Sequence, residues 1–402
     1  MARTDTLGNF LTDVAIAIRN KKGTTDTIVA SNFDTEIESI ETGGGTTEPI
    51  FTGHYDTEGL RQIGWTDEEI EYYNQNGVQW NGSEDNYFKL TQTELAGDDS
   101  KNTRFLPKSS TKTSFNNYNK LLAIPNIETS SVTNIDTMFS HCYSLTTIPQ
   151  LNTGNITSMN NMFYDCYSLT TIPQLNTGNV TNMHNMFYDC YSLKTIPQLD
   201  TSNVTNMNNT FNGCYSLKMI PQLDTSNVTN MDNMFSSCRS LTTIPQLNTG
   251  NVTSMNNMFA SCSSLETVPQ LNTSNVTSIA SMFASCSSLE TVPQLDTSNV
   301  TSIVNMFANC SSLKTLGGLL NLGQAYKTTT SVNSYSYKVD LSGSPKLTEQ
   351  SLINILNNLY DIATKGCKTQ QVVIGSTNLA KLTSEEGQQA LSNAQTKGWT
   401  VS

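Results

Sequence analysis

The stretch LTTIPQLNTGNVTNMHNMFYDCYS, residues 169–192, is followed directly by LKTIPQLDTSNVTNMNNTFNGCYS, residues 193–216. The same pattern of 24 residues runs in register from Leu121, and a last, incomplete copy starts at Leu313. A fixed period of this length is typical of solenoids, in which a unit can bury its apolar face only against its neighbours. The sequence therefore predicts a stacked repeat over residues 121–316.

Each unit opens with a short apolar segment that leads into a polar turn. In one copy Leu169 and Ile172 start this segment and Pro173 follows them. Proline has no N–H group to donate to a ladder of strands, so we expect a short and partly irregular extended segment. Asn179 and its equivalents in the next turn are expected to form a ladder that bonds backbone groups, since asparagine tolerates unusual dihedral angles.

The second half of each unit carries apolar residues at spacings of three and four. This spacing predicts a short helical turn, which can pack onto the extended segment across a narrow core. The residues in one copy are Val180, Met183, Met186 and Phe187.

Eight of the nine cysteines also recur every 24 residues, which places one thiol per coil at the same position of the core. Adjacent coils lie about 4.8 Å apart, but parallel side-chain vectors disfavour disulfides between them. No Cys-x-x-Cys pair points to a zinc site. We therefore expect small, buried, free thiols. The repeat cysteines are Cys142, Cys166, Cys190, Cys214, Cys238, Cys262, Cys286 and Cys310, and Cys367 stands apart.

The composition argues against several classes of function. The 402 residues carry a net charge of −12 and the basic residues form no stripe, so we expect no nucleic-acid partner. No stretch approaches about 18 apolar residues, and the first residues lack the layout of a secretory signal. We therefore expect no membrane insertion, synthesis in a cytoplasm, and Asn-x-Thr sequences that serve as turns rather than glycan acceptors.

Catalytic motifs are missing from the sequence. It has three histidines, with no metal-spaced pair, no nucleophile elbow and no phosphate-binding loop. We expect no catalytic residues, no metal and no cofactor, and a binding or structural protein rather than an enzyme. A glycan-degrading enzyme stays open as an alternative, because it needs only two carboxylates about 5–9.5 Å apart in a cleft.

Residues 1–45 are predicted to form short helices that attach or oligomerise the chain. Apolar residues spaced three and four apart mark one helix over residues 4–22 and a second over residues 33–40. Such short helices cannot bury their apolar stripe alone, so they either dock on a partner or pack on each other. The residues proposed for this role are Leu7, Phe10, Leu11, Val14, Ile18, Phe33, Ile37 and Ile40.

Three further segments flank the repeat. Residues 46–96 are predicted to be a small α+β unit, with a helix that a Thr66-x-x-Glu69 capping box opens, followed by strands near 78–80 and 87–90. Residues 97–120 read as an irregular linker. Residues 317–402 alternate helix and strand, with helices at 347–359 and 384–397 and strands at 371–374 and 399–401. This pattern suits a cap that shields the core of the last coil from water.

The expected fold is thus an α+β repeat: a leucine-rich-repeat-type solenoid with short N-terminal helices, a small α+β unit and an α/β C-terminal cap. The unit resembles the BspA-type leucine-rich repeats of bacterial surface and phage proteins. The matching residues are Leu223 to Met231, which read LDTSNVTNM, followed by Met234, Phe235 and Cys238. This resemblance covers about half of the chain and implies a curved solenoid used for adhesion or recognition.

The flanking segments resemble virion proteins from phages of Gram-positive gut bacteria. The matching stretches are TLGNFLTDV at residues 6–14, SNFD at 31–34 and GLRQIGWTD at 59–67. This resemblance implies a tail-fibre or baseplate protein whose N-terminal segment attaches to the virion. Similar caps end many phage-borne BspA-type proteins.

Positions that differ between repeats are the candidates for binding. Tyrosine or arginine follows the cysteine in the first five coils, whereas serine follows it in the last three, and a second tyrosine column lies beside the first. Stacked tyrosines could offer ring faces and hydroxyls to a sugar or a protein, or they could simply cover the coil edge. The candidate ligand-binding residues are Tyr143, Tyr167, Tyr191, Tyr215, Tyr164, Tyr188 and Arg239, with the polar column Gln150, Gln174 and Gln198.

Together these features predict a phage virion appendage that binds a host surface glycan or protein through the solenoid. Its N-terminal segment would bind other virion proteins, as a homo-oligomer for which a trimer is favoured, and lysis would release it. The alternatives are a bacterial cell-surface adhesin and a head fibre or capsid decoration.

Overall fold

The computed structural model describes residues 55–76, 90–326, 338–365 and 370–402. The chain divides into two units, Met1–Thr52 and Gly53–Ser402, and the fold described below belongs to the second. The helices predicted over residues 4–22 and 33–40 and the strand predicted near 78–80 lie outside the described residues, as does Cys367. Of the strand predicted near 87–90, only Leu90 is described.

Short helices precede the repeats. The predicted capping box is confirmed: the backbone N–H of Thr66 donates to Glu69 Oε2 at 2.8 Å, and that of Glu69 donates to Thr66 Oγ1 at 3.2 Å. Those helices in the described residues are α3 (Thr57–Gln62), α4 (Asp67–Asn76) and α5 (Gln92–Leu95).

Side chains of α4 bind the first coils directly. Tyr72 donates its hydroxyl hydrogen to the backbone oxygen of Ile148 at 2.7 Å, and Tyr73 Oη accepts from the N–H of Ile124 at 3.1 Å. The buried carboxylate of Glu69 accepts from the N–H of Asn126 at 2.7 Å and also contacts Lys108. These bonds tie the helices to the start of the solenoid.

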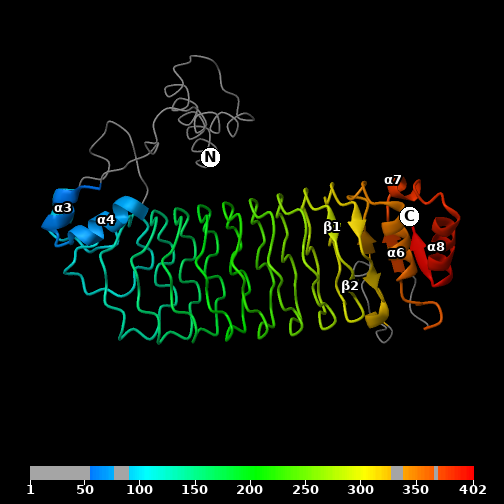
Figure 1. Ribbon diagram of the computed structural model, residues 1–402, viewed down its shortest axis with the longest axis horizontal. Coiled ribbons are helices and arrows are strands. Elements are labelled where there is room, and N and C mark those ends of the chain that lie inside the picture. The colour runs from blue at the N-terminus through cyan, green and yellow to red at the C-terminus, as the bar shows by residue number, and fades with distance from the viewer. Residues whose placement is uncertain (1–54, 77–89, 327–337, 366–369) are drawn as a thin grey trace, which may run out of the picture. The chain divides into compact units, whose positions relative to one another are not determined.

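The repeats form a stack of parallel coils, drawn in green to yellow in Figure 1. Regular strands are two residues long and occur only in the last coils of the described repeat. Pro293 lies between one pair of them, and Gly317 and Gly318 lie between the other. The prediction of short, irregular extended segments is therefore confirmed. The strands are β1 (Thr291–Val292), β2 (Leu295–Asp296), β3 (Thr315–Leu316) and β4 (Leu319–Leu320), with β1 paired to β3 and β2 to β4 in parallel.

The helical turn predicted for the second half of the unit is wrong. Residues 183–190 form successive tight turns, in which the N–H of Met186 donates to Met183 O and that of Cys190 to Phe187 O, both at 3.1 Å. Asn185 and Asp189 have φ of 54° and 56°, in the left-handed region that a right-handed helix cannot include. A chain of such turns buries apolar residues at the same spacings of three and four as a helix does.

A column of phenylalanines forms the middle of the core. Rings of successive coils stack with centroids 5.5–5.8 Å apart, from Phe115 through to Phe307. Phe115 belongs to the segment 97–120, which the sequence suggested was a linker, so part of that segment contributes a further rung to the solenoid core.

The eight repeat cysteines lie beside this column and are buried and free, as predicted. Each donates its thiol to the phenylalanine carbonyl 27 residues earlier, such as Cys166 Sγ to Phe139 O at 3.1 Å. Burial raises the pKa of Cys142 to about 12, and it also raises the pKa of the other repeat thiols. These thiols are therefore protonated at neutral pH and unreactive.

The predicted asparagine ladder is confirmed. Asn179 Nδ2 donates to the backbone oxygen of Gly154 at 2.8 Å, and Asn203 Nδ2 donates to that of Gly178 at 2.7 Å. The same bond to the preceding coil recurs through Asn299. The left-handed dihedral angles fall elsewhere in the coil, at Asn185 and its equivalents.

The C-terminal cap shares the core of the solenoid. Helix α6 lies against the last coil, where Ser351 Oγ accepts from the N–H of Leu316 at 3.1 Å and donates to Lys314 O at 3.2 Å. The predicted helices and strands of this region are confirmed. They are the helices α6 (Glu349–Asn357) and α8 (Glu385–Thr396) and the strands β6 (Gln370–Val373) and β7 (Trp399–Val401). The structure adds η2 (Gln324–Tyr326), α7 (Ser376–Leu379) and β5 (Lys338–Asp340), and β5, β6 and β7 form a parallel sheet.

Candidate functional site

Two columns of half-buried tyrosines run across the first coils, and we call them together the tyrosine strip. In the longer column the ring centroids are 4.6–4.8 Å apart and the ring planes differ by 5–7°. In the shorter column the two rings are 4.8 Å apart. The longer column is Tyr143, Tyr167, Tyr191 and Tyr215, and the shorter is Tyr164 and Tyr188.

The rings of the strip cover each other's faces. A ligand ring or sugar needs roughly 3.5–4 Å on each side of itself, so none fits between rings only 4.6–4.8 Å apart. Between successive rings no face is therefore open to a ligand, and the column presents ring edges and hydroxyls there. The last face of the longer column is also covered, because the guanidinium of Arg239 lies 4.4 Å from the Tyr215 ring centroid.

Two carboxylates lie within the strip. Asp165 and Asp189 each follow a tyrosine of the shorter column, and both have a left-handed backbone, with φ of 60° and 56°. Asp165 Oδ2 is 3.1 Å from Nδ1 of His141, and Tyr191 donates its hydroxyl hydrogen to Asp189 Oδ2 at 3.2 Å. Burial raises the pKa of both carboxyl groups, and their proximity raises that of Asp189 further.

The same surroundings keep the tyrosines protonated. Burial, followed by the charge of the nearby Asp165, raises the pKa of Tyr167 to about 12. Burial and Asp189 raise the pKa of Tyr191 in the same way. The hydroxyls of Tyr167 and Tyr191 are therefore neutral groups at physiological pH and can donate hydrogen bonds.

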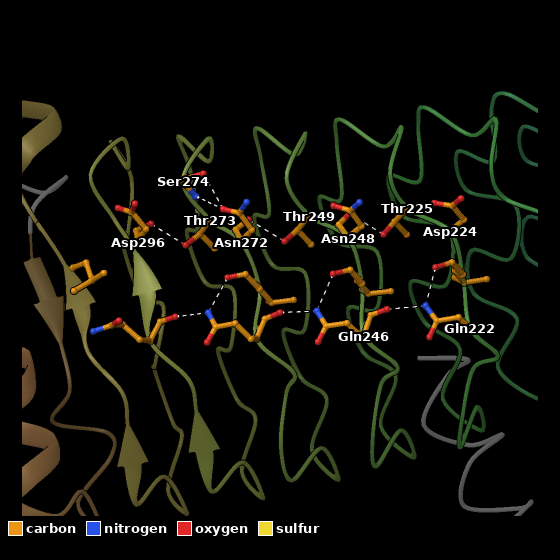
Figure 2. A pocket seen from close by; sticks show the side chains of 16 residues that line it. Gln222, Asp224, Thr225, Gln246, Asn248, Thr249, Asn272, Thr273, Ser274 and Asp296 are labelled. Carbon is orange, nitrogen blue, oxygen red and sulfur yellow. Dashed lines mark hydrogen bonds between the residues drawn. The ribbon is translucent and has the colours of Figure 1, made fainter.

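A second surface, which we call the glutamine groove, follows the glutamine column of the extended segments. One part of the groove has a volume of about 850 Å³ and runs from Gln222 to Gln294, and another of about 880 Å³ includes Gln150, Gln174 and Gln198. Figure 2 shows its glutamine side chains in a row beside the threonine and Asx side chains.

The glutamine amide nitrogens donate hydrogen bonds to the backbone of the solenoid. Gln222 Nε2 donates to its neighbour Leu223 O at 3.1 Å and to Gln246 O of the next coil at 2.7 Å, as the dashed lines in Figure 2 show. The predicted candidates Gln150, Gln174 and Gln198 make the same two bonds. Only the side-chain oxygens of these glutamines are left for a ligand.

Sequence reasoning missed the carboxylates of the strip. His141, Asp165 and Asp189 occupy one position of the repeat, between the two tyrosine positions, and Gly213 and Ser237 follow there in later coils. The motif Tyr-Asp-Cys-Tyr, present at residues 164–167 and 188–191, is the signal that could have shown it.

Within residues 55–76, 90–326, 338–365 and 370–402, no group of three His, Cys, Asp or Glu residues could hold a metal ion. No helix in these same ranges is long and apolar enough to cross a membrane. The arrangement of the strip suits recognition, through hydroxyl donors beside carboxylate acceptors.

One protein family matches this chain, and the match covers the repeats. The family described as "Mycoplasma protein of unknown function, DUF285" matches residues 109–219 and 216–319. Among solved structures, a leucine-rich repeat protein from Bacteroides ovatus is 15% identical, with 72% of this chain and 85% of that chain covered and a TM-score of 0.31.

A leucine-rich repeat protein from Eubacterium ventriosum is also 15% identical, with coverage of 60% and 88% and a TM-score of 0.26. Superpositions this loose say nothing about what the chain binds. No curated protein matches the sequence significantly.

Proposed function

The chain belongs to the family described as "Mycoplasma protein of unknown function, DUF285", and we propose that within this family it is a non-enzymatic recognition protein that binds a host surface glycan or protein through the tyrosine strip. The observation that carries the proposal is the confinement of the strip to the first coils. Coils with Ser263, Ser287 or Ser311 in place of the tyrosines keep the same buried core, so folding does not require the aromatic residues.

The composition of the strip also favours binding. Tyrosine supplies a large, rigid contact area at low entropic cost, which is why it is enriched in binding surfaces. Six tyrosines and an arginine lie together here on a rigid stack, since each coil is bonded to the next through its backbone. Hydroxyl donors beside carboxylates suit polar ligands better than an apolar surface does.

The setting we propose is a phage virion appendage, either a tail fibre or a baseplate protein. The N-terminal residues would attach it to other virion proteins as a homo-oligomer, with a trimer favoured, and lysis would release it. This setting rests on the resemblance of the flanking segments to virion proteins. A bacterial cell-surface protein is the second candidate, since a repeat solenoid that presents a binding face suits it equally well, and a capsid decoration is a variant of the first.

A cell-binding assay tests the molecular part of the proposal. The full chain, labelled with a fluorophore, is incubated with cells of the source bacterium or phage host. Replacing Tyr143, Tyr167, Tyr191 and Tyr215 together by serine is expected to abolish binding, whereas replacing Ser263, Ser287 and Ser311 by alanine, at the same repeat position, leaves it unchanged. Circular dichroism and melting curves verify that both variants fold.

Two further measurements test the remaining claims. Unchanged binding by the folded tyrosine variant would show that the strip is not the binding surface. Peptides of the chain in mass spectra of purified phage particles support the virion setting, and their absence from the particles refutes it. Release of sugars from host wall polysaccharide by the purified chain would overturn the non-enzymatic assignment.

A further inference from the structure

We propose that the tyrosine strip binds an arginine side chain of a partner protein, with Asp189 as the anionic contact and the ring of Tyr188 as the stacking surface. The inference deepens the proposed function and rests on it in one respect: it takes the strip to be the binding surface. It names the chemistry of the ligand, which the proposed function leaves open between a glycan and a protein.

The first reason is an imbalance of charge within the strip. Asp165 has His141 beside it, 3.1 Å away, and its side chain is 15% exposed. Asp189 lies one coil further along, where the residues described in the structure provide no cationic group within 4 Å of it. Among the described residues, the Tyr191 hydroxyl is the one side-chain donor to this half-buried carboxylate. The charge of Asp189 is therefore incompletely compensated by these residues, and a cation from a partner supplies what is missing.

The second reason is the end of the shorter tyrosine column. The longer column ends with Arg239 stacked on Tyr215, at 4.4 Å. The shorter column ends at Tyr188, on which no further ring and no cationic group stacks among the described residues. The residue at the corresponding position of the next coil is Asn212, whose amide donates to Asn209 Oδ1 at 3.3 Å. The longer column thus ends with a guanidinium stacked on its last ring, and among the described residues the shorter column does not.

The third reason is the glycine that faces Asp189. A Cβ added to Gly213 would lie 2.0 Å from Asp189 Oδ1, so only glycine leaves room for this carboxylate. Backbone conformation alone does not require the glycine, because Ser237 and Asp165 adopt left-handed φ of 62° and 60° at the same repeat position. Gly213 and Asp189 therefore form a matched pair, in which the Asp189 carboxylate fills the place that a side chain at position 213 would occupy.

An arginine suits this place better than another cation. Its planar guanidinium can stack on an aromatic face and donate two hydrogen bonds to one carboxylate, whereas a lysine ammonium is a compact and strongly hydrated charge. The chain already uses the same pairing of guanidinium and tyrosine at Arg239. The net charge of −12 further favours a basic partner through long-range attraction.

Peptide titration tests the inference on the full chain. A blocked tri-arginine peptide is titrated at low salt. A tri-citrulline peptide of the same length keeps the planar side-chain group but lacks the charge, and a tri-lysine peptide keeps the charge but lacks the planar group. The Asp189→Asn variant is expected to bind the arginine peptide roughly tenfold or more weakly, because a hydrogen-bonded ion pair is lost. The matched control is Glu266→Gln, which removes the same charge from an exposed position of a plain coil and should bind as the unmodified chain does.

Each outcome decides the question. The inference is supported if binding of the arginine peptide depends on Asp189 and if the citrulline and lysine peptides bind more weakly than the arginine peptide. Equal binding of arginine and citrulline peptides, equal binding of arginine and lysine peptides, or equal loss in the Asp189→Asn and Glu266→Gln variants overturns it. If the tyrosine variants lose cell binding while the arginine peptide shows no dependence on Asp189, this inference fails and the proposed function stands.

Discussion

Glu94 and Arg104 form a two-pronged ion pair at the base of the first coils. Arg104 Nε donates to Glu94 Oε1 at 3.1 Å, and Arg104 Nη2 donates to Oε2 at 2.8 Å. Glu94 is 4% exposed and also accepts from the backbone N–H groups of Thr91 and Arg104. Burial alone would raise the pKa of this carboxyl group, but these hydrogen bonds outweigh burial and lower the pKa to about 2.

We expect this pair to make the free energy of unfolding depend on pH in the acid range. The pKa of Glu94 is lower in the folded chain than the ordinary value of 4.5, so its contribution is fully present above that value and disappears as the pH falls towards 2. At pH 7 the Glu94→Gln variant should lose about 3 kcal/mol, from a shift of this size. Denaturant titrations between pH 7 and pH 2 measure the difference, with Glu58→Gln as an exposed control. A loss that stays constant down to pH 2 would contradict the assignment.

Asp189 should have the opposite effect. Burial raises the pKa of its carboxyl group above the ordinary value of 3.8, so stability is lost as the pH rises from that ordinary value through the raised pKa. The Asp189→Asn variant is therefore expected to melt at a higher temperature than the unmodified chain at pH 7, and the difference should shrink as the pH approaches 4.

The control for this prediction is Asp200→Asn. Hydrogen bonds from Ser202 lower the pKa of Asp200, so its replacement should bring no gain in melting temperature. A gain in both variants would point to net charge rather than to burial. A stabilised Asp189→Asn variant that has lost its ligand would fit a residue kept for binding at the expense of stability.

The glutamine column should behave as a structural ladder. Gln198 Nε2 donates to Leu199 O at 3.1 Å and to Gln222 O at 2.6 Å. Gln198→Ala should lower the free energy of unfolding by about 1–2 kcal/mol for two lost hydrogen bonds. Gln198→Glu should lower it more at pH 7, because a carboxylate oxygen then faces two carbonyl oxygens. Chemical denaturation of both variants at pH 7 measures this order, and equal stability of Gln198→Glu and the unmodified chain would show that the ladder is not needed.

The repeat thiols should resist alkylation in the folded chain. Their burial and raised pKa leave almost no thiolate at pH 8, and the thiolate is the reactive form. Iodoacetamide followed by peptide mass spectrometry should leave Cys142, Cys190 and their equivalents unmodified until denaturant is added. Rapid labelling of any repeat cysteine in the native chain would show that its coil opens.

The repeat itself made much of this fold predictable. A period of 24 residues places Cys166 and Cys190 at one position of the core, and both are buried there. The helix from Glu385 could be predicted because its start is set locally by the Ser384 cap. The turns at Asn185 and Asp189 could not, since the spacing of apolar residues is the same in a helix and only the φ angles distinguish the two.

The site was predictable in outline. The columns of tyrosines follow from register alone, so Tyr143 and Tyr167 were expected to be neighbours, and they are stacked. The placement of the Asp189 carboxylate against Gly213 depends on the direction of one side chain in a left-handed turn. The amino-acid sequence alone does not reveal this direction. Phe115 was missed because the residues around it depart from the 24-residue pattern.

The two side-chain ladders of the coil run in opposite directions along the chain. Each glutamine donates to the coil that follows, as Gln222 does to Gln246, and each asparagine donates to the coil that precedes, as Asn203 does to Gly178. Every internal coil therefore presents one side-chain donor and one backbone acceptor of these ladders at each of its two interfaces. A whole coil can be gained or lost by recombination between near-identical stretches of the gene without leaving any of these groups unpaired. The distance between the tyrosines and the C-terminal cap can thus evolve in steps of one coil, while the tyrosine strip itself stays intact.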